Sequence, residues 1–402
     1  MQVKILPGVC QRNVFGGRGG AQMIFMGINL PKDKPGIIGV VVTPEFNIAA
    51  EIAQIPGVGV QDILNTEPNL RALSLATKKK PFNIFLVNGG KGGAGHNAIV
   101  WPFSNRHKGE VVGTPGNEKV KVKWGDQEIL IPANWPPPNS GWKAEPSRAI
   151  HGFGYRKPNT IIKGEWDGKE SCFLEGETNV SADEWFTILL VTHRISLEKG
   201  VLKRTVSVKN LGKVPVPFAC GEHPDFAIPE GQSREGVLLG IPARLLVKVT
   251  NMKDLLPDFG NYPFIPVNQL KPFGRLFRAR NDEGLFPIGN TFIDTCFTGL
   301  DENPVVRVLF PEVKWGISVK GSTVSSPDMI NALQIYAPPP GGPKLVAVEL
   351  QGNVPDPFNP AWDSYGEIKQ CKEWLTGSGM HIIKPDGHFR TWHVSHRIEM
   401  RP

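Results

Sequence analysis

The sequence predicts an all-β protein built from antiparallel strands with few short helices. Of its 402 residues, 45 are Gly and 37 are Pro, so about one residue in five interrupts or tightens the backbone. Helix interiors tolerate these residues poorly, whereas short strands need them at every reversal. Several windows also alternate between apolar and polar residues with a period of two, which is typical of half-buried strands.

Two windows show the alternation clearly. In Lys119–Trp124 every second residue is Val or Trp and the others are Lys. In residues 202–209 the apolar Leu202, Val206 and Val208 alternate with Lys, Thr and Ser. Each window therefore predicts a strand with one buried and one solvated face.

Turn residues recur at short intervals around the second window, at 198–200, 210–213 and 222–224. Strands of about seven to ten residues joined by such short turns form an antiparallel meander, because parallel crossovers need longer connections. Similar strand patterns occupy residues 305–319, 335–351 and 391–400.

Helical patterns are sparse. Two short candidates lie at residues 47–55 and 365–375, each flanked by Pro or Gly. No repeat of 20 to 50 residues is visible, which argues against a propeller or a solenoid. The Pro-rich pieces at 135–138 and 338–343 are too short to separate domains. We expect one domain over residues 1–402, with residues 1–75 as an N-terminal portion of it.

Composition excludes several classes of function. The 45 Lys and Arg against 38 Asp and Glu give a net charge of +7, a mild excess over 402 residues. The tight basic run at 78–80 is short and has no aromatic ladder beside it, so we interpret it as a solvated loop and expect no nucleic-acid partner. The longest apolar runs, 37–42 and 186–191, are strand-sized, whereas a membrane span needs about 20 residues.

The cysteines indicate a reducing compartment. There are five of them, Cys10, Cys172, Cys220, Cys296 and Cys371, far apart and without Cys-x-x-Cys spacing. This pattern argues against a disulfide framework or a zinc site. The first residues lack the features of a secretory signal, so we expect a cytoplasmic protein that does not associate with membranes. The oligomeric state stays open.

A glycine cluster at 89–95 suggests a phosphate loop, but Lys91 is followed by Gly92 rather than by Ser or Thr. We interpret it as a tight loop. Arg106 and His151 each follow small or turn-forming neighbours, as polar groups at strand ends do. By itself this pattern is weak evidence for a site, because a lone histidine in an aromatic setting is usually a hydrogen-bonded structural group.

Two further residues suit proton transfer. His223 lies in the stretch Cys220-Gly-Glu-His-Pro-Asp, where Pro224 restricts the backbone. An imidazole with an ordinary pKa near ~6.5 gives or takes a proton at neutral pH. Glu349 is the single carboxylate of the apolar stretch 346–350. A buried carboxylate needs a partner, so Glu349 belongs either to a structural ion pair or to a functional site.

These segments together resemble the aldose 1-epimerase (galactose mutarotase) family. The family pattern Asn-Arg-Ile is similar to residues 105–107, and His-Gly-Phe-Ala-Arg is similar to residues 151–156. The family strand that ends in Gly-x-His-Pro-x-Phe is similar to residues 208–226, and its Glu-Pro-Gln signature with a following Pro-Asp is similar to residues 349–356. A weaker Asp-containing segment matches residues 292–297. The segments are collinear over residues 80–402.

The resemblance implies a large β-sandwich of the galactose mutarotase-like type (a supersandwich) and an enzyme that interconverts the α and β anomers of a hexose or a related sugar. Glu349 would be the base at the O1 hydroxyl, and His223 the acid at the ring oxygen, with the two groups on opposing sides of the sugar. Arg106, His151 and Asp294 would bind ring hydroxyls. The resemblance also implies a monosaccharide as the partner and a reaction that needs no metal ion and no organic cofactor.

The sequence departs from the family pattern at His107, Leu350, Gly352 and Thr295. These positions concern the shape of the pocket, so the identity of the sugar stays open. Two alternatives keep the fold and change the function. One is a carbohydrate-binding protein without catalysis. The other is a different sugar-active enzyme, such as a sugar-phosphate mutarotase or a lyase, in which Arg106, Arg148 and Arg156 would clamp a phosphate.

Overall fold

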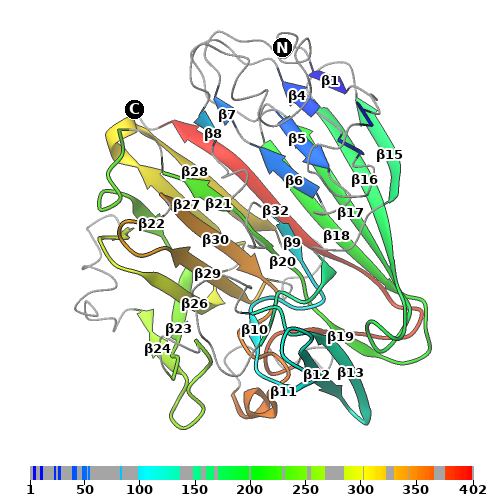
Figure 1. Cartoon of the computed structure of the whole chain (residues 1–402). Helices are drawn as coiled ribbons and strands as arrows, with labels where there is room; N and C mark the ends of the chain where they lie inside the picture. Colours follow the sequence, from blue (N-terminus) through cyan, green and yellow to red (C-terminus); the bar gives the residue numbers. More distant parts are fainter. Residues whose placement is uncertain are drawn as a thin grey trace.

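The structure is a computed structural model, and Figure 1 shows the arrangement of its strands. It describes residues 98–135, 148–154, 160–166, 171–198, 201–228, 231–250, 255–267, 285–301, 303–322, 330–342, 344–365 and 376–400, together with short strands between residues 3 and 83. The glycine cluster at 89–95, the basic run at 78–80 and the helix candidate beyond Tyr365 lie outside these residues.

The larger of two main sheets has nine strands, all paired antiparallel. Its order is β15 (Thr160–Trp166), β16 (Ser171–Val180), β17 (Leu189–Glu198), β18 (Val201–Asn210), β32 (His388–Met400), β28 (Trp315–Ser322), β27 (Val305–Phe310), β22 (Leu238–Gly240) and β25 (Phe286–Pro287). The turn predicted at 198–200 lies between β17 and β18, which pair antiparallel as expected. After the turn predicted at 210–213 the chain leaves this sheet, since β18 pairs next with β32 and β19 (Val216–Phe218) pairs with β31 (His381–Ile383).

The second main sheet has eight strands and is also antiparallel. Its order is β24 (Phe264–Pro266), β23 (Ala243–Val247), β26 (Ile293–Leu300), β29 (Ala332–Ala337), β30 (Leu345–Gln351), β20 (Gly221–His223) and β9 (Ala98–Val100), and β21 (Asp225–Ala227) also pairs with β30. The predicted run 335–351 thus forms two strands, which the turn at Gly342 separates.

Smaller sheets surround the two main ones. They are β10 (Arg106–His107) with β14 (Ala149–Ile150), β11 (Glu110–Val112) with β12 (Lys119–Trp124) and β13 (Gln127–Pro132), and β19 (Val216–Phe218) with β31 (His381–Ile383). Two-stranded antiparallel N-terminal sheets pair β1 (Val3–Ile5) with β4 (Met26–Ile28), β2 (Cys10–Gln11) with β3 (Gln22–Met23), β5 (Gly39–Val42) with β6 (Ile48–Glu51), and β7 (Ala53–Gln54) with β8 (Phe82–Asn83).

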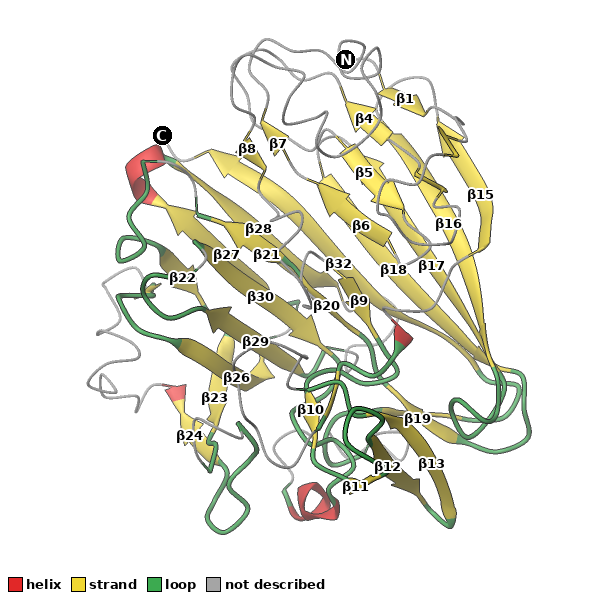
Figure 2. Ribbon diagram, viewed as in Figure 1, coloured by secondary structure: helices red, strands yellow, loops and turns green. Residues whose placement is uncertain are grey.

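The helix predicted at 47–55 is wrong. Residues of this segment form β6 and β7, and β6 pairs with β5 in the register Val41 opposite Ala49. Pairing with a neighbouring strand overrides the local helical pattern here. Among the described residues, helix is confined to short pieces such as η3 (Pro311–Val313) and η4 (Pro360–Ser364) (Figure 2).

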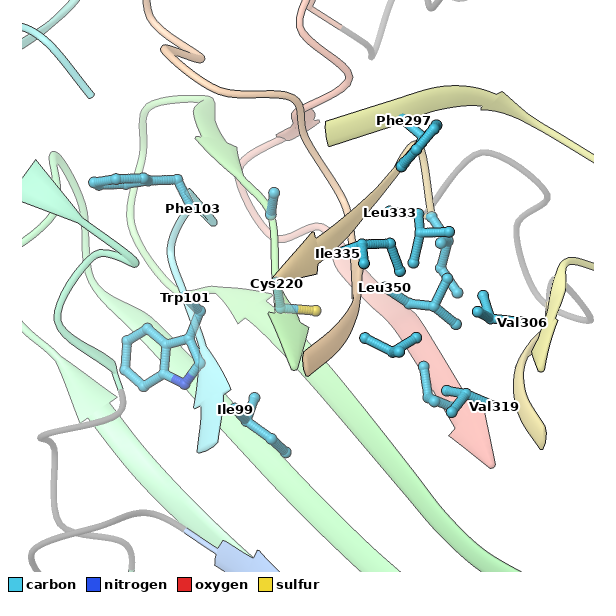
Figure 3. Close-up of a cluster of buried hydrophobic side chains, with 14 of the residues drawn as sticks. Ile99, Trp101, Phe103, Cys220, Phe297, Val306, Val319, Leu333, Ile335 and Leu350 are labelled. Atoms are coloured by element: carbon cyan, nitrogen blue, oxygen red, sulfur yellow. The ribbon is translucent and has the colours of Figure 1, made fainter. Parts of the chain in front are cut away.

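The core lies between the two main sheets. Leu333, Ile335 and Leu350 of the eight-stranded sheet belong to the same buried cluster as Val306 and Val319 of the nine-stranded sheet (Figure 3). Because side chains alternate along a strand, the neighbours of these apolar residues point to the other face of the eight-stranded sheet. That other face carries Asp294, Gln334 and Glu349.

The predicted alternation is confirmed where the structure describes it. Val120 and Val122 are buried in β12, and Val206 and Val208 are buried in β18. The described residues contain no helix that combines the length and the apolar character needed to cross a membrane.

Candidate active site

Polar side chains gather on four adjacent strands of the eight-stranded sheet, in an otherwise apolar region. Asp294 lies on β26, Gln334 on β29, Glu349 on β30 and His223 on β20. Gln334 pairs directly with Glu349 across β29 and β30, and Cys296 pairs with Gln334 across β26 and β29. Residues at paired positions share one face of a sheet, so these side chains emerge side by side.

His223 and Glu349 are in contact. Gly221 pairs with Gln351 and Asp225 pairs with Ala347, so the same register places His223 opposite Glu349. The His223 Nε2 atom lies 3.2 Å from the Glu349 Oε1 atom. The Glu349 side chain is 2% exposed and the His223 side chain is 17% exposed, so solvent reaches the pair through the imidazole.

Gln351 holds the other carboxylate oxygen, because its Nε2 atom donates to Glu349 Oε2 at 2.8 Å. Both oxygens of Glu349 therefore have a nearby polar partner, and the carboxylate is fixed in orientation. The buried Glu349 thus has the polar partners that the sequence analysis required, His223 and Gln351.

Arg106 comes to the cluster from the small sheet of β10 and β14. Its Nη2 atom donates to Asp294 Oδ2 at 2.8 Å, and each of the two side chains is 6% exposed. The guanidinium carbon lies 4.8 Å from the centre of the Trp135 ring, within the range of a cation–π contact. Arg106 is thus held from two sides.

His151 directly follows β14 and is fixed by Asn105. The Asn105 backbone N–H donates to His151 Nδ1 at 3.1 Å, and the His151 backbone N–H donates to the Asn105 carbonyl at 3.0 Å. Because Nδ1 accepts a hydrogen bond, the proton of the neutral ring is on Nε2. Burial, with His223 and Arg106 nearby, holds the pKa of His151 well below its ordinary value, so the ring is neutral at neutral pH.

The two histidine rings meet edge to face, with their centres 5.1 Å apart and an angle of 84° between their planes. His151 also lies close to Glu349, since ligand-type atoms of His151, His223 and Glu349 all fall within 4.8 Å of one another. All five residues that the sequence nominated therefore lie in one cluster.

Gln334 completes the cluster, and the sequence analysis missed it. Its Nε2 atom donates to Asp294 Oδ1 at 2.6 Å, and its Oε1 atom accepts from Asn105 Nδ2 at 2.7 Å. Gln334 therefore links the sheet to the segment that carries Arg106 and His151. Its signal in the sequence is the same as that of Glu349, namely one polar residue with a long side chain in an apolar strand.

The neighbouring His107 has a different role. Its Nδ1 atom lies 3.1 Å from Asp356 Oδ1, and the Lys108 backbone N–H donates to the same oxygen at 2.9 Å. Burial raises the pKa of Asp356, but the hydrogen bonds from His107, Asn359 and Lys108 together bring it below its ordinary value. The Asp356 backbone N–H also donates to the Arg106 carbonyl at 2.6 Å. Asp356, paired with His107, therefore anchors strand β10, which carries Arg106.

Two further expectations concern arginines and cysteines. Arg148 is buried and its backbone pairs with Trp135, whereas Arg156 lies outside the described residues. Cys220 and Cys296 are free and buried. Burial, together with Glu349 and Asp294, raises the pKa of Cys296 well above its ordinary value, so this thiol is no nucleophile at neutral pH.

His151, His223 and Glu349 are also the residue types of a catalytic zinc site. A histidine binds a metal ion through a ring nitrogen with a free lone pair. In His151 the Nδ1 lone pair accepts from the Asn105 backbone, and Nε2 carries the proton. The arrangement therefore suits hydrogen bonding and proton transfer better than metal binding.

No model of a protein family matches this chain, and no curated protein matches it. Solved structures do. A galactose mutarotase-like protein from Clostridium acetobutylicum is 15% identical, with 99% of this chain and 98% of that chain covered and a TM-score of 0.61. A GalM/aldose epimerase homologue from C. elegans is 12% identical, with 95% and 100% covered and a TM-score of 0.59. A galactose 1-epimerase from Lactobacillus acidophilus is 14% identical, with 100% and 99% covered and a TM-score of 0.58. At such identities the likeness concerns the fold alone, and the chain has the galactose mutarotase-like β-sandwich fold.

Proposed function

We propose that this protein is an aldose 1-epimerase, an isomerase that interconverts the α and β anomers of a monosaccharide. A cyclic aldose is a hemiacetal, and exchange of its anomers requires opening of the ring, rotation about the C1–C2 bond and closing on the other face. Opening removes a proton from the O1 hydroxyl and delivers one to the ring oxygen. One base and one acid are sufficient.

The observation that carries the proposal is the contact between Glu349 and His223 at 3.2 Å. Glu349 takes the proton of O1, and His223 gives a proton to the ring oxygen. The sequence led us to expect these groups on opposing sides of the sugar, but the strand register sets them side by side. Both target oxygens are bonded to the same carbon, so a sugar that lies across the pair meets both groups.

The remaining polar residues form the binding set. Asp294 offers carboxylate oxygens, Arg106 offers guanidinium N–H groups, and the neutral His151 offers its Nε2–H. Gln334 adds an amide next to Asp294. These donors and acceptors are held by one another, so hydroxyl groups of a sugar meet a fixed pattern and little ordering is needed on binding.

The charges of the cluster favour a neutral sugar over a sugar phosphate. In the described part of the cluster, two carboxylates, Glu349 and Asp294, accompany the single guanidinium of Arg106. That guanidinium already pairs with Asp294 and stacks on Trp135. A phosphate dianion would be repelled by Glu349 and would compete with Asp294 for its cation.

Proton transfer alone provides enough acceleration. A positioned acid or base contributes about 10²- to 10⁴-fold. Mutarotation also proceeds unaided in water, so no metal ion or organic cofactor is required by this mechanism.

The test is the mutarotation of α-glucose and α-galactose, followed by polarimetry. Glu349→Gln keeps the size of the side chain and removes the base, so we expect the enzymatic acceleration to fall by at least about 10²-fold. Glu128→Gln on the exposed face of β13 is the matched control and should retain full activity. Full activity in Glu349→Gln would exclude the proposed mechanism.

The direct contact between His223 and Glu349 also favours one alternative, a carbohydrate-binding protein in which the two groups only hold hydroxyls. The two functions differ in anomer exchange. Exchange spectroscopy of a bound sugar by NMR distinguishes them, because a binding protein would hold the sugar without accelerating the exchange between its anomers.

A further inference from the structure

A second polar cluster lies buried between the two main sheets, behind the candidate active site. Arg204 projects from β18 of the nine-stranded sheet and Glu222 from β20 of the eight-stranded sheet. The Arg204 Nη1 atom lies 3.7 Å from Glu222 Oε2, and both side chains are 0% exposed. Burial lowers the pKa of Arg204 to about 10, so its charge persists at neutral pH.

His193 and Trp101 extend this cluster. His193 pairs with Val206, two positions from Arg204 on the same face of the nine-stranded sheet. The Trp101 Nε1–H donates to His193 Nε2 at 3.1 Å. Burial and the charge of Arg204 lower the pKa of His193 to about 3, so this ring is neutral and accepts from the indole.

Each end of the cluster lies next to a histidine of the candidate active site. Glu222 immediately precedes His223, and alternation along β20 points their side chains to opposite faces of the sheet. The Trp101 carbonyl accepts from the backbone N–H groups of Phe153 at 3.1 Å and Gly154 at 2.8 Å. These residues closely follow His151.

A buried ion pair often contributes less to the stability of a core than apolar side chains would. Charges taken out of water lose their hydration, and well-packed apolar residues of similar size often give equal or greater stability. The surrounding positions, such as Val206 and Val208, are apolar and buried. The cluster therefore calls for an explanation other than stability.

We propose that the buried cluster of Arg204, Glu222, His193 and Trp101 is a positioning device that fixes His223 and His151 relative to each other. Arg204 joins β18 to β20 through Glu222, and His193, which neighbours Arg204 on the nine-stranded sheet, joins that sheet through Trp101 to the 151–154 segment. Its members touch no substrate, and they act through the two histidines. The effect on catalysis rests on the proposed function, whereas the effect on the geometry of the histidines does not.

The experiment uses the double variant Arg204→Met with Glu222→Met, which replaces both charges together and leaves neither one buried alone. We expect a folded protein in which kcat for mutarotation falls by about 10²-fold, because small displacements of catalytic groups have effects of this size. We expect the KM to change much less than kcat. Val306→Ala, a core substitution on β27, is the control for a general loss of packing and should keep the wild-type kcat.

A second measurement does not depend on activity. The ¹⁵N NMR signals of the His223 and His151 rings report their tautomers and environments, and we expect them to shift in the double variant and to stay unchanged in Val306→Ala. If the wild-type protein fails to accelerate mutarotation, the proposed function is wrong, but the NMR comparison still decides the positioning role. Unchanged histidine signals in the folded double variant would overturn it.

Trp101→Phe covers the case in which the double variant does not fold. It removes the indole N–H that reaches His193 and keeps the Arg204–Glu222 pair. We expect the His151 signals to shift. If they stay at their wild-type positions, the Trp101 end of the cluster has no positioning role and the proposal is overturned as stated.

Discussion

Arg106 and Asp294 form a buried ion pair at 2.8 Å between two different sheets, β10 of a small sheet and β26 of the eight-stranded sheet. The two residues are 188 positions apart in the sequence. Their contact brings the segment that carries Arg106 onto the face of the sheet that carries Glu349. The pair therefore serves both the fold and the candidate active site.

Asp294→Ala would leave the Arg106 guanidinium buried without its carboxylate partner. Removal of one partner from a buried pair costs about 3–5 kcal/mol, so we expect the free energy of unfolding to fall by this amount. Urea denaturation measures the change. Glu128→Ala removes an exposed carboxylate that pairs with Lys121 at 3.3 Å and with Lys123 at 3.9 Å, and its effect should be much smaller. Equal losses in the two variants would show that the buried pair contributes no more than a surface contact.

Gln334→Leu tests the link between Asp294 and Asn105. The Leu side chain fits a buried strand but removes one donor and one acceptor, and each buried polar group left without its partner costs about 1–3 kcal/mol. We expect lower stability and a higher KM for the sugar, because Asp294 and His151 lose a common support. Gln127→Leu at an exposed position of β13 is the matched control. A KM equal to that of the wild type would exclude a role of Gln334 in the binding set.

The sequence predicted the fold class well because strand patterns are local. Val120 and Val122 show their burial through alternation alone, and the short turns around residue 200 require antiparallel neighbours. The collinear motifs nominated five site residues, and the structure brings all five together. Their catalytic and binding roles, the single-domain organisation and the cytoplasmic location stay predictions.

Other features depend on pairing between distant strands, which one sequence does not reveal. The contact between His223 and Glu349 follows from the register of β20 against β30. Arg204 occupies an inward position in β18 next to the buried apolar Val206, and its contact with Glu222 of the opposite sheet gives its charge a partner. The segment at 47–55 forms strands because β5 pairs with its first strand, β6, and β8 pairs with its second strand, β7.

The lowered pKa of His193 predicts that the free energy of unfolding decreases as the pH falls through the acidic range. Its pKa is lowered from 6.5 to about 3 in the folded protein, chiefly by burial. Below about pH 6.5 the unfolded chain binds a proton that the folded chain does not bind, so the free energy of unfolding falls as the pH falls towards the folded pKa. The expected slope from this one group is about 1.4 kcal/mol per pH unit.

His193→Gln removes this titration and keeps an acceptor for the Trp101 indole. We expect the pH dependence of the free energy of unfolding to become flatter by about that slope between about pH 4 and pH 6. His151 has a lowered pKa for similar reasons, so part of the dependence should persist. Urea denaturation at a series of pH values gives both curves, and parallel curves would contradict the buried, neutral state of His193.

Gly152 and Gly125 form a matched pair for the last prediction. Both have left-handed backbones, with φ of +60° and +56°. Because a residue with a Cβ atom is strained in this conformation, substitution by Ala should lower the free energy of unfolding by about 1–2 kcal/mol at either position. At Gly152 the new Cβ would also lie 2.4 Å from the Trp101 carbonyl oxygen, whereas at Gly125 nothing lies within 4 Å. Because a backbone oxygen has little room to move, Gly152→Ala should displace the segment that carries His151.

We therefore expect Gly152→Ala to lose more stability than Gly125→Ala and to lose mutarotase activity, while Gly125→Ala keeps that activity. Thermal denaturation and polarimetry on the two variants provide the comparison. If both variants keep the wild-type rate, the placement of His151 tolerates movement of its loop, and the tight fit between Gly152 and Trp101 serves the fold without serving the reaction.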